Sequence, residues 1–319
     1  MPKSEETSPS LLKSTRHHPS LNRILTHVLD VWPNHERYLA ASLLAENSCD
    51  LKQVEEVARL ILLLGGEKLS EWADDYKWLC ERFKEEQMHF FRHKQYRLSS
   101  LKDATEQVYN NEVFMSRYMN AVLFTQLFWK NHALSMDLFR TRFIPESPEG
   151  YDYLEVGPGH GLFMSFVAMD DRCNSLTGWD LSSTSLEDTR SALEKMRARD
   201  ADNIQLEQND IVSATNVSQR FDCIMCSEVL EHTEEPEKAL GNLYGLLRDQ
   251  GRIYLNIPVN SPAPDHIYLW TESEQVSNAV IQAGFNIEYS LELPPTGKTL
   301  ETAKRQGLDI SCIIIGRRN

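Results

Sequence analysis

The sequence predicts an α/β fold, with a seven-stranded, mostly parallel sheet, an antiparallel edge strand and an all-helical N-terminal domain before the sheet. Up to about residue 147, apolar residues recur at helical spacing. Pro145, Pro148 and Gly150 then interrupt that pattern. Beyond them, short β-prone runs alternate with amphipathic runs, which is the order of a parallel sheet joined by crossover helices.

The composition is that of a globular protein. The chain has 319 residues, of which 41% are hydrophobic and 25% are charged, and its longest apolar run, residues 60–64, is too short to span a bilayer. Residues 1–19 are polar and lack the apolar core of a secretory signal, so we expect a disordered lead-in. These features predict a cytoplasmic protein with no membrane partner.

The charge balance and the cysteines limit the partners and the chemistry. The net charge is -14 and no cluster of Lys and Arg is present, so we expect no nucleic-acid partner. The six cysteines are scattered along the chain, which favours reduced thiols. Cys223 and Cys226 form a C-x-x-C pair inside an apolar run without a second pair, and we interpret them as buried structural thiols.

Residues 20–147 are predicted to form the helical N-terminal domain. Asp50 and Gln53 fit a capping box, and Gly65 and Gly66 end the amphipathic run that follows. The apolar stretch from residue 108 to 139 contains no proline and fits one long helix, or two helices broken near Asn131. We expect this domain to form a lid, a wall of the substrate pocket or a homodimer contact.

Residues 148–319 are predicted to form the sheet domain. Its expected helices cover residues 161–169, 183–199, 236–248 and 272–283. The last two strands are joined without an obvious helix, so we expect them to pair antiparallel at one edge. The seven expected strands cover residues 151–156, 175–180, 203–207, 221–226, 251–257, 286–292 and 309–316.

A glycine-rich turn follows the first expected strand. Glu155 ends the strand, and Gly157, Gly159 and Gly161 then alternate with Pro158 and a histidine before the next helix. Strand, glycine turn and helix form the first half of a Rossmann-like unit. The last glycine of the dinucleotide fingerprint is replaced by Leu162, which argues against a dinucleotide ligand.

Polar groups stand at the ends of three later strands. Asp180 is followed by Leu181 and Ser182, Asn209 and Asp210 are followed by Ile211, and Ser227 opens the string Ser-Glu-Val-Leu-Glu-His. Carboxylates at such strand ends accept hydrogen bonds from ribose hydroxyls. Two alternatives remain open, because Asp180 could instead cap the following helix and Asp210 could form an Asx turn.

The turn E-x-G-x-G-x-G resembles motif I of the class I S-adenosylmethionine (SAM)-dependent methyltransferases. The string E-V-L-E-H, followed by Pro236, a leucine-rich helix and a glycine-led strand, resembles the ubiquinone-biosynthesis-type branch of small-molecule methyltransferases. The resemblance covers residues 150–317. It implies that Glu155 and the turn hold the amino-acid half of SAM, Asp180 the ribose and Asp210 the adenine, with Ile211 on the ring.

The cofactor site implied by this resemblance includes one residue from the helical domain, Tyr118, with Tyr109 as the alternative. The predicted cofactor-binding residues are Glu155, Gly157, Pro158, Gly159, Gly161, Asp180, Leu181, Ser182, Asn209, Asp210, Ile211, Ser227, Glu228, Val229 and Tyr118.

Two histidines are the candidate general bases, since imidazole titrates near neutral pH. His232 follows the fourth strand and His266 lies in the loop after the fifth. Asp265 and His266 could instead join His232 around a metal ion, but we predict no metal site. His89 and His93 have metal-compatible spacing without a nearby third ligand, so we assign them to an exposed helical face.

The function predicted from the sequence is methyl transfer from SAM to a carbon, oxygen or nitrogen atom of a small molecule in specialised metabolism. One alternative is a protein or RNA methyltransferase. The other is a methyltransferase-fold protein that transfers no methyl group.

Overall fold

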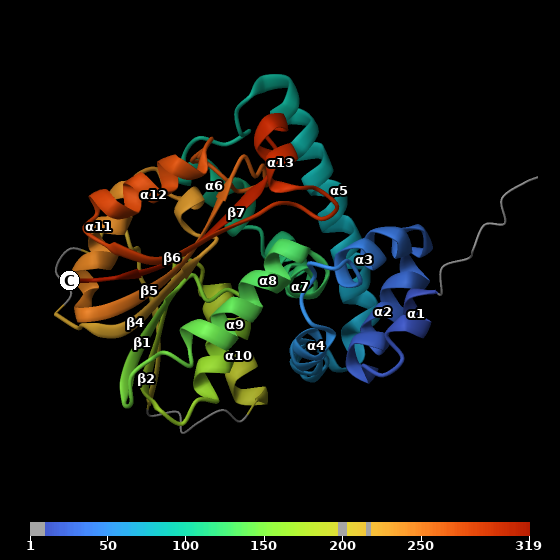
Figure 1. The fold of residues 1–319 in the computed structure, drawn as a ribbon, viewed down its shortest axis with the longest axis horizontal. Helices are drawn as coiled ribbons and strands as arrows, with labels where there is room; N and C mark the ends of the chain where they lie inside the picture. Colours follow the sequence, from blue (N-terminus) through green and yellow to red (C-terminus); the bar gives the residue numbers. More distant parts are fainter. Residues whose placement is uncertain (1–9, 197–202, 215–217) are drawn as a thin grey trace, which may run out of the picture.

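The computed structural model describes residues 10–196, 203–214 and 218–319, and its centre is a seven-stranded sheet (Figure 1). The strand order is β3-β2-β1-β4-β5-β7-β6. Strand β7 runs antiparallel to both of its neighbours, and the other pairs are parallel. The predicted fold class is confirmed, with the antiparallel strand one position inside the edge. The strands are β1 Tyr151–Val156, β2 Cys173–Asp180, β3 Ile204–Gln208, β4 Phe221–Ser227, β5 Leu247–Val259, β6 Asn286–Leu293 and β7 Ile310–Arg317.

Helices cover both faces of the sheet. In Figure 1, α11 and α12 lie on one face, and α8, α9 and α10 lie on the other. Residues 197–199 of the second predicted helix lie outside the described residues. The elements of this half are α9 Leu162–Ala168, α10 Ser183–Lys195, η6 Leu230–His232, α11 Pro236–Leu246, α12 Ser273–Gln282 and α13 Leu300–Gln306.

Helix α13 corrects the expectation that β6 and β7 are joined without a helix. The hydroxyl of Thr299 caps its start by accepting a hydrogen bond from the Thr302 amide, and Gly307 ends it in the left-handed conformation. Ala303 is its one buried residue. A seven-residue helix with so narrow a buried face leaves almost no apolar periodicity in the sequence.

The N-terminal half is helical, as predicted. The apolar stretch divides into α7 and α8 at Trp129, whose extended backbone separates them near the predicted Asn131. No described helix is long and apolar enough to cross a bilayer. The elements are α1 Leu11–Ser14, α2 Pro19–Val31, η1 Pro33–His35, α3 Glu36–Leu43, α4 Leu51–Gly65, η2 Gly66–Lys68, α5 Leu69–His93, α6 Leu101–Ala104, η3 Thr105–Tyr109, α7 Glu112–Phe128, α8 Lys130–Leu138 and η4 Phe139–Phe143.

The predicted disordered lead-in is wrong for residues 10–19, whereas residues 1–9 lie outside the described part of the chain. Leu11 begins α1 and is 1% exposed. Its backbone amide donates to a carboxylate oxygen of Glu36 at 2.9 Å. The apolar pair Leu11 and Leu12 therefore anchors this segment on α2 and α3, despite its polar surroundings.

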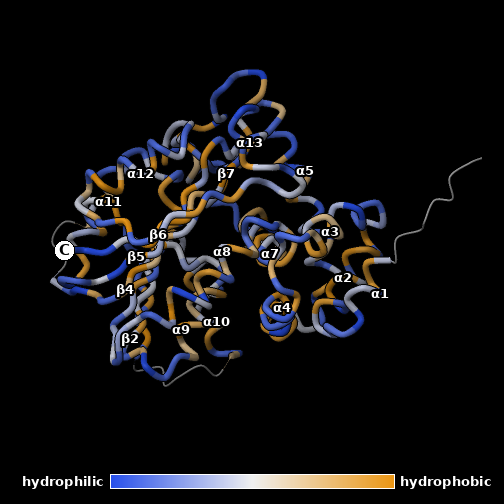
Figure 2. Tube along the Cα trace, viewed as in Figure 1, coloured by the Kyte–Doolittle hydropathy of each residue, from blue (hydrophilic) through white to orange (hydrophobic). Residues whose placement is uncertain are grey.

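One hydrophobic cluster runs across the junction between the two halves. Phe139 of η4 stacks edge-on against Phe163 of α9 and Tyr254 of β5, with ring centroids 5.2 and 5.4 Å apart. The buried hydroxyls of Ser135 and Tyr254 lie 2.9 Å apart. Figure 2 shows hydrophobic segments along the inner strands and on the helices packed against them. The last N-terminal helices therefore form part of the sheet's own cover.

Candidate functional site

A cavity of about 240 Å³ lies at the carboxyl ends of β1, β2 and β4, and helices α5 and α7 contribute to its wall. In a parallel sheet this edge is where ligands bind, because the loops that leave the strands diverge there. The cavity therefore lies where the sequence places the cofactor site.

The glycine turn lies against the cavity through Gly157 and Gly159. Gly157 has a φ of +73°, and a Cβ atom at this position would lie 2.5 Å from Cγ2 of Val229. Glycine is therefore required both by the backbone and by the close approach. Gly161 has a different place, since it does not line the cavity, and a Cβ there would lie 2.9 Å from the Thr189 backbone of α10.

Glu155 is a buried carboxyl group at the end of β1. It is 3% exposed and accepts one hydrogen bond, from the hydroxyl of Tyr153 at 2.8 Å. Burial raises the pKa of Glu155 to about 8 because water no longer solvates the charged form. A cationic group bound beside it would favour its ionisation.

Asp180 ends β2 and does not cap the following helix. The N-cap of α10 is Ser182, whose hydroxyl accepts from the Ser185 amide. Asp180 accepts from the Ser182 amide at 2.8 Å, and burial raises its pKa to about 6. The capping alternative is therefore wrong, and the carboxylate lines the cavity.

Asp210 forms the Asx turn and also lines the cavity. One carboxylate oxygen accepts from the Val212 amide at 2.9 Å, and the other accepts from the Ser213 hydroxyl at 2.8 Å. These bonds fix the carboxylate at the cavity wall beside the largely buried side chain of Ile211. The turn and the ligand role are therefore compatible.

The structure brings together every predicted cofactor residue except Gly161. The cavity is lined by Glu155, Gly157, Pro158, Gly159, Asp180, Leu181, Ser182, Asn209, Asp210, Ile211, Ser227, Glu228, Val229 and Tyr118.

The cavity wall is acidic. Among the described residues, no lysine or arginine lines it. Its carboxylates therefore favour a ligand with positive charge and disfavour phosphate or carboxylate groups without a counterion. The acidic side chains are Glu155, Asp180, Asp210, Glu228, Asp265 and Asp309.

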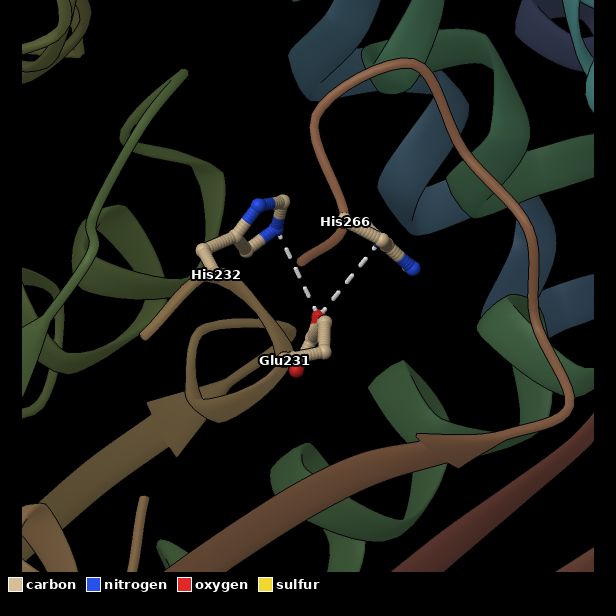
Figure 3. A group of neighbouring side chains, drawn as sticks. All are labelled: Glu231, His232 and His266. Carbon is tan, nitrogen blue, oxygen red and sulfur yellow. Dashed lines mark ion pairs between the residues drawn. The ribbon is translucent and has the colours of Figure 1, made fainter. Parts of the chain in front are cut away.

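The two predicted bases meet deeper in the site, with ring centroids 4.8 Å apart (Figure 3). Nδ1 of His232 lies 3.1 Å from the Asp265 carbonyl oxygen and 3.1 Å from the Tyr109 hydroxyl. Nδ1 of His266 lies 2.6 Å from the Ser261 carbonyl oxygen. Tyr109 and Tyr118 thus both reach this region, and the Tyr118 hydroxyl donates to Asp265 at 3.1 Å.

Glu231 is the residue that sequence reasoning missed. It is 0% exposed, and its Oε1 lies 3.5 Å from Nε2 of His232 and 3.8 Å from Nε2 of His266. Burial, together with the nearby carboxylates of Glu228 and Asp265, raises its pKa well above the usual range. The repeated acid in E-V-L-E-H was the available signal, but the pattern does not show which acid faces the two histidines.

Glu231, His232 and His266 form a group able to hold a metal ion, with all three ligand atoms within 4.8 Å of one another. The acid of this group is Glu231, whereas the alternative considered from the sequence used Asp265. Asp265 instead faces the outer nitrogen of His232, with Oδ2 3.5 Å from Nδ1.

Comparisons with known proteins agree with this geometry. Residues 154–253 match the family model of a methyltransferase domain. The ubiquinone biosynthesis O-methyltransferase of Coxiella burnetii is 28% identical over 130 residues, which cover 41% of this chain and 53% of that protein. Its counterpart from Pseudomonas paraeruginosa is 32% identical over 149 residues, which cover 46% and 55%. The matched segment thus spans about half the length of these relatives.

A solved structure shares the fold. The O-methyltransferase family protein from Burkholderia thailandensis matches with a TM-score of 0.50 and 12% identity, over 83% of this chain and 72% of that one. The family match assigns residues 154–253 to a methyltransferase domain, and the strand order and the strand-end carboxylates agree with the class I SAM-dependent methyltransferase fold.

Proposed function

We propose that this protein transfers the methyl group of SAM to a small molecule held in the same cavity. The observation that carries the proposal is that Glu155, Asp180 and Asp210, from three successive strand ends, line one cavity beside the Gly157 turn. The sulfonium makes the methyl group electrophilic, so the protein's main task is to hold the acceptor atom in line with the C–S bond.

The wall opposite the cofactor residues supports a small acceptor. Helices α5 and α7 and Trp129 supply an apolar surface there, formed by Leu79, Phe83, Met115, Met119, Val122 and Trp129. Without lysine or arginine, this described lining offers nothing to neutralise the phosphates of RNA. The helical half would thus serve as a pocket wall, while its roles as a lid and as a homodimer contact remain predictions.

The names of the curated relatives, ubiquinone biosynthesis O-methyltransferases, favour an oxygen acceptor. A hydroxyl loses its proton as the methyl group arrives, so a base or another way to stabilise the oxyanion is required. His232 and His266 line the cavity and remain the predicted bases.

The test combines product detection with cofactor binding. The full chain is incubated with trideuteromethyl SAM and a metabolite extract, and mass spectrometry follows the label. We expect labelled small molecules with wild type. Asp180→Ala should raise the Kd for SAM roughly 10- to 100-fold, because hydrogen bonds to charged groups contribute about 1.5–3 kcal/mol.

Asp171→Ala is the matched control, since Asp171 is exposed and does not line the cavity. It should bind SAM as wild type does. Unchanged binding by Asp180→Ala would overturn the ribose assignment. Label found in the protein fraction but in no small molecule would overturn the small-molecule acceptor.

A further inference from the structure

Three potential electron-pair donors face one another behind the cofactor residues. Nε2 of His232 and Nε2 of His266 lie 3.5 and 3.8 Å from Oε1 of Glu231, and dashed lines mark both pairs in Figure 3. Both separations are too long for a hydrogen bond. No described lysine or arginine side chain lines this cavity, so none supplies a positive charge to the space between the three atoms.

The outer nitrogens fix which ring atoms carry protons. A carbonyl oxygen can only accept, so Nδ1 of His266, 2.6 Å from the Ser261 carbonyl, carries the hydrogen. Nδ1 of His232 lies 3.1 Å from both the Asp265 carbonyl, which can only accept, and the Tyr109 hydroxyl, which can accept or donate, so the carbonyl favours a hydrogen on this nitrogen too. In the neutral rings both Nε2 atoms then present lone pairs toward Glu231. Metal-binding histidines are oriented in this way by an acceptor behind the ring.

Glu231 differs from Glu155 and Asp265, the other buried carboxyl groups of the site, and Asp265 accepts a hydrogen bond from the Tyr118 hydroxyl. Glu155 accepts a hydrogen bond from Tyr153, whereas neither oxygen of Glu231 has a hydrogen-bond partner. Glu231 is also the one carboxyl among the described residues with both oxygens buried and unpartnered. Burying an unpaired carboxylate is strongly unfavourable, so such a group indicates a missing cation or proton.

The backbone joins the two segments that carry these side chains. Glu231 and His232 are adjacent in η6, and His266 lies in the loop after β5. The amides of Ile267 and Tyr268 both donate to the carbonyl oxygen of Glu231, at 2.9 Å each. The loop is thereby fastened to η6 directly beside the three ligands, which preorganises the group before any ion binds.

We propose that Glu231, His232 and His266 form a site for one divalent cation such as Zn²⁺, Mn²⁺, Fe²⁺ or Co²⁺. Two imidazole nitrogens and one carboxylate suit these ions, whereas Mg²⁺ and Ca²⁺ favour oxygen ligands. The ligand atoms lie within 4.8 Å of one another, so a small contraction would bring them around one ion.

The two histidines line the cavity and Glu231 lies behind them. The remaining coordination positions would therefore face the cavity, as in sites where a metal ion keeps a position for substrate.

This placement has a consequence that rests on the proposed methyl transfer. An acceptor hydroxyl bound to the ion would lose its proton more easily, since a metal ion lowers the pKa of a bound oxygen. The proton would pass to solvent, and the oxygen would then attack the methyl carbon as the C–S bond breaks. The histidines would act as ligands, so their Nε2 atoms could not also serve as bases.

The test measures binding of the metal alone, without SAM. The full chain is stripped with a chelator, dialysed and titrated with Co²⁺, which reports its ligands by visible absorption, and with Zn²⁺ by calorimetry. We expect one ion per chain in wild type. Glu231→Gln and His266→Gln should each weaken metal binding by roughly 10- to 100-fold or more. Loss of a group that only hydrogen-bonds to a metal ligand already costs about this much, and each variant removes a ligand itself.

The control is the double variant His89→Gln/His93→Gln, which removes a pair on α5 whose rings lie 4.5 Å apart, outside this cavity. It should bind one ion as wild type does. Each variant is also titrated with SAM, because retained SAM binding shows that the sheet domain is folded. Failure to bind Co²⁺ and Zn²⁺ in a wild-type protein that binds SAM would overturn the site and leave the methyltransferase proposal standing.

Equal metal affinity of wild type and both single variants would also overturn the proposal. So would loss of the ion in the α5 double variant. If Glu231→Gln does not fold, His266→Gln decides, because its ring is held from outside the group by the Ser261 carbonyl and not by either other ligand.

Discussion

The two ends of the cavity are built in different ways. At the cofactor end, Glu155 and Asp180 lie at the ends of β1 and β2, Asp210 lies two residues after β3, and nearby backbone amides orient Asp180 and Asp210. At the acceptor end, the groups come from distant segments: Tyr109 and Tyr118 from the helical half, His232 from η6 and His266 from a loop. The first end is encoded locally, and the second exists only once the helices have packed against the sheet.

The largest expected effect tests whether the two ends belong to one folding unit. Phe139→Ala should lower the free energy of unfolding by about 3–5 kcal/mol, since Phe139 is 0% exposed and joins the helical half to the sheet. Because the cluster runs across both halves, chemical denaturation should show a single transition that moves as a whole.

Leu63→Ala is the control, because Leu63 is 52% exposed and its truncation should change stability by less than about 0.5 kcal/mol. Two separate unfolding transitions, of which Phe139→Ala moves only one, would show that the helical half folds independently.

The contrast between the two ends also explains what the sequence could predict. The carboxyl ends of neighbouring parallel strands meet at one edge, so acids such as Asp180 could be placed together from the strand pattern alone. Glu228 lines the cavity, whereas Glu231 faces the two histidines because of the short η6 turn, and periodicity does not reveal either direction. From the sequence, Asp265 was the plausible third ligand because it is adjacent to His266.

The next effect concerns the glycine turn of the cofactor end. Gly157→Ala should weaken SAM binding by about tenfold or more, because its Cβ would lie 2.5 Å from Val229 in a turn with a φ of +73°. Gly159→Ala is matched in backbone, with a φ of +52°, but its Cβ meets nothing nearer than the Met119 sulfur at 3.6 Å. Calorimetry on both variants separates the steric contact from the backbone strain. Equal losses would assign the whole effect to the backbone.

A smaller effect follows from the buried carboxyl of Glu155. Its folded-state pKa of about 8 lies above its ordinary value of 4.5, so folding takes up a proton between these pH values. Its contribution to stability is complete below pH 4.5 and is lost as the pH rises toward 8, by at most ~1.4 kcal/mol per pH unit.

Glu155→Gln should therefore raise the Tm of the ligand-free protein at pH 8 and leave it nearly unchanged at pH 4.5, while it weakens SAM binding. Thermal melts at both pH values, with and without SAM, measure the gain in stability of the free protein and the loss of SAM binding. A variant that is less stable than wild type at pH 8 would show that the ionised carboxylate is stabilised in the fold.

The smallest effect asks whether the two ends are energetically separate. Tyr118→Phe removes the hydroxyl that donates to the buried Asp265, and should cost about 0.5–1.5 kcal/mol in the free energy of unfolding. Tyr268→Phe is the matched change at the surface, where the hydroxyl donates to the exposed Glu237, and should cost less than about 0.5 kcal/mol.

Because the Tyr118 hydroxyl is engaged by Asp265, we expect both variants to keep the wild-type Kd for SAM within about twofold. The sequence predicted instead that Tyr118 touches the cofactor, and the same titration distinguishes these alternatives. A Kd raised tenfold by Tyr118→Phe alone would mean that this hydroxyl serves SAM, and that helix α7 belongs to both ends of the cavity.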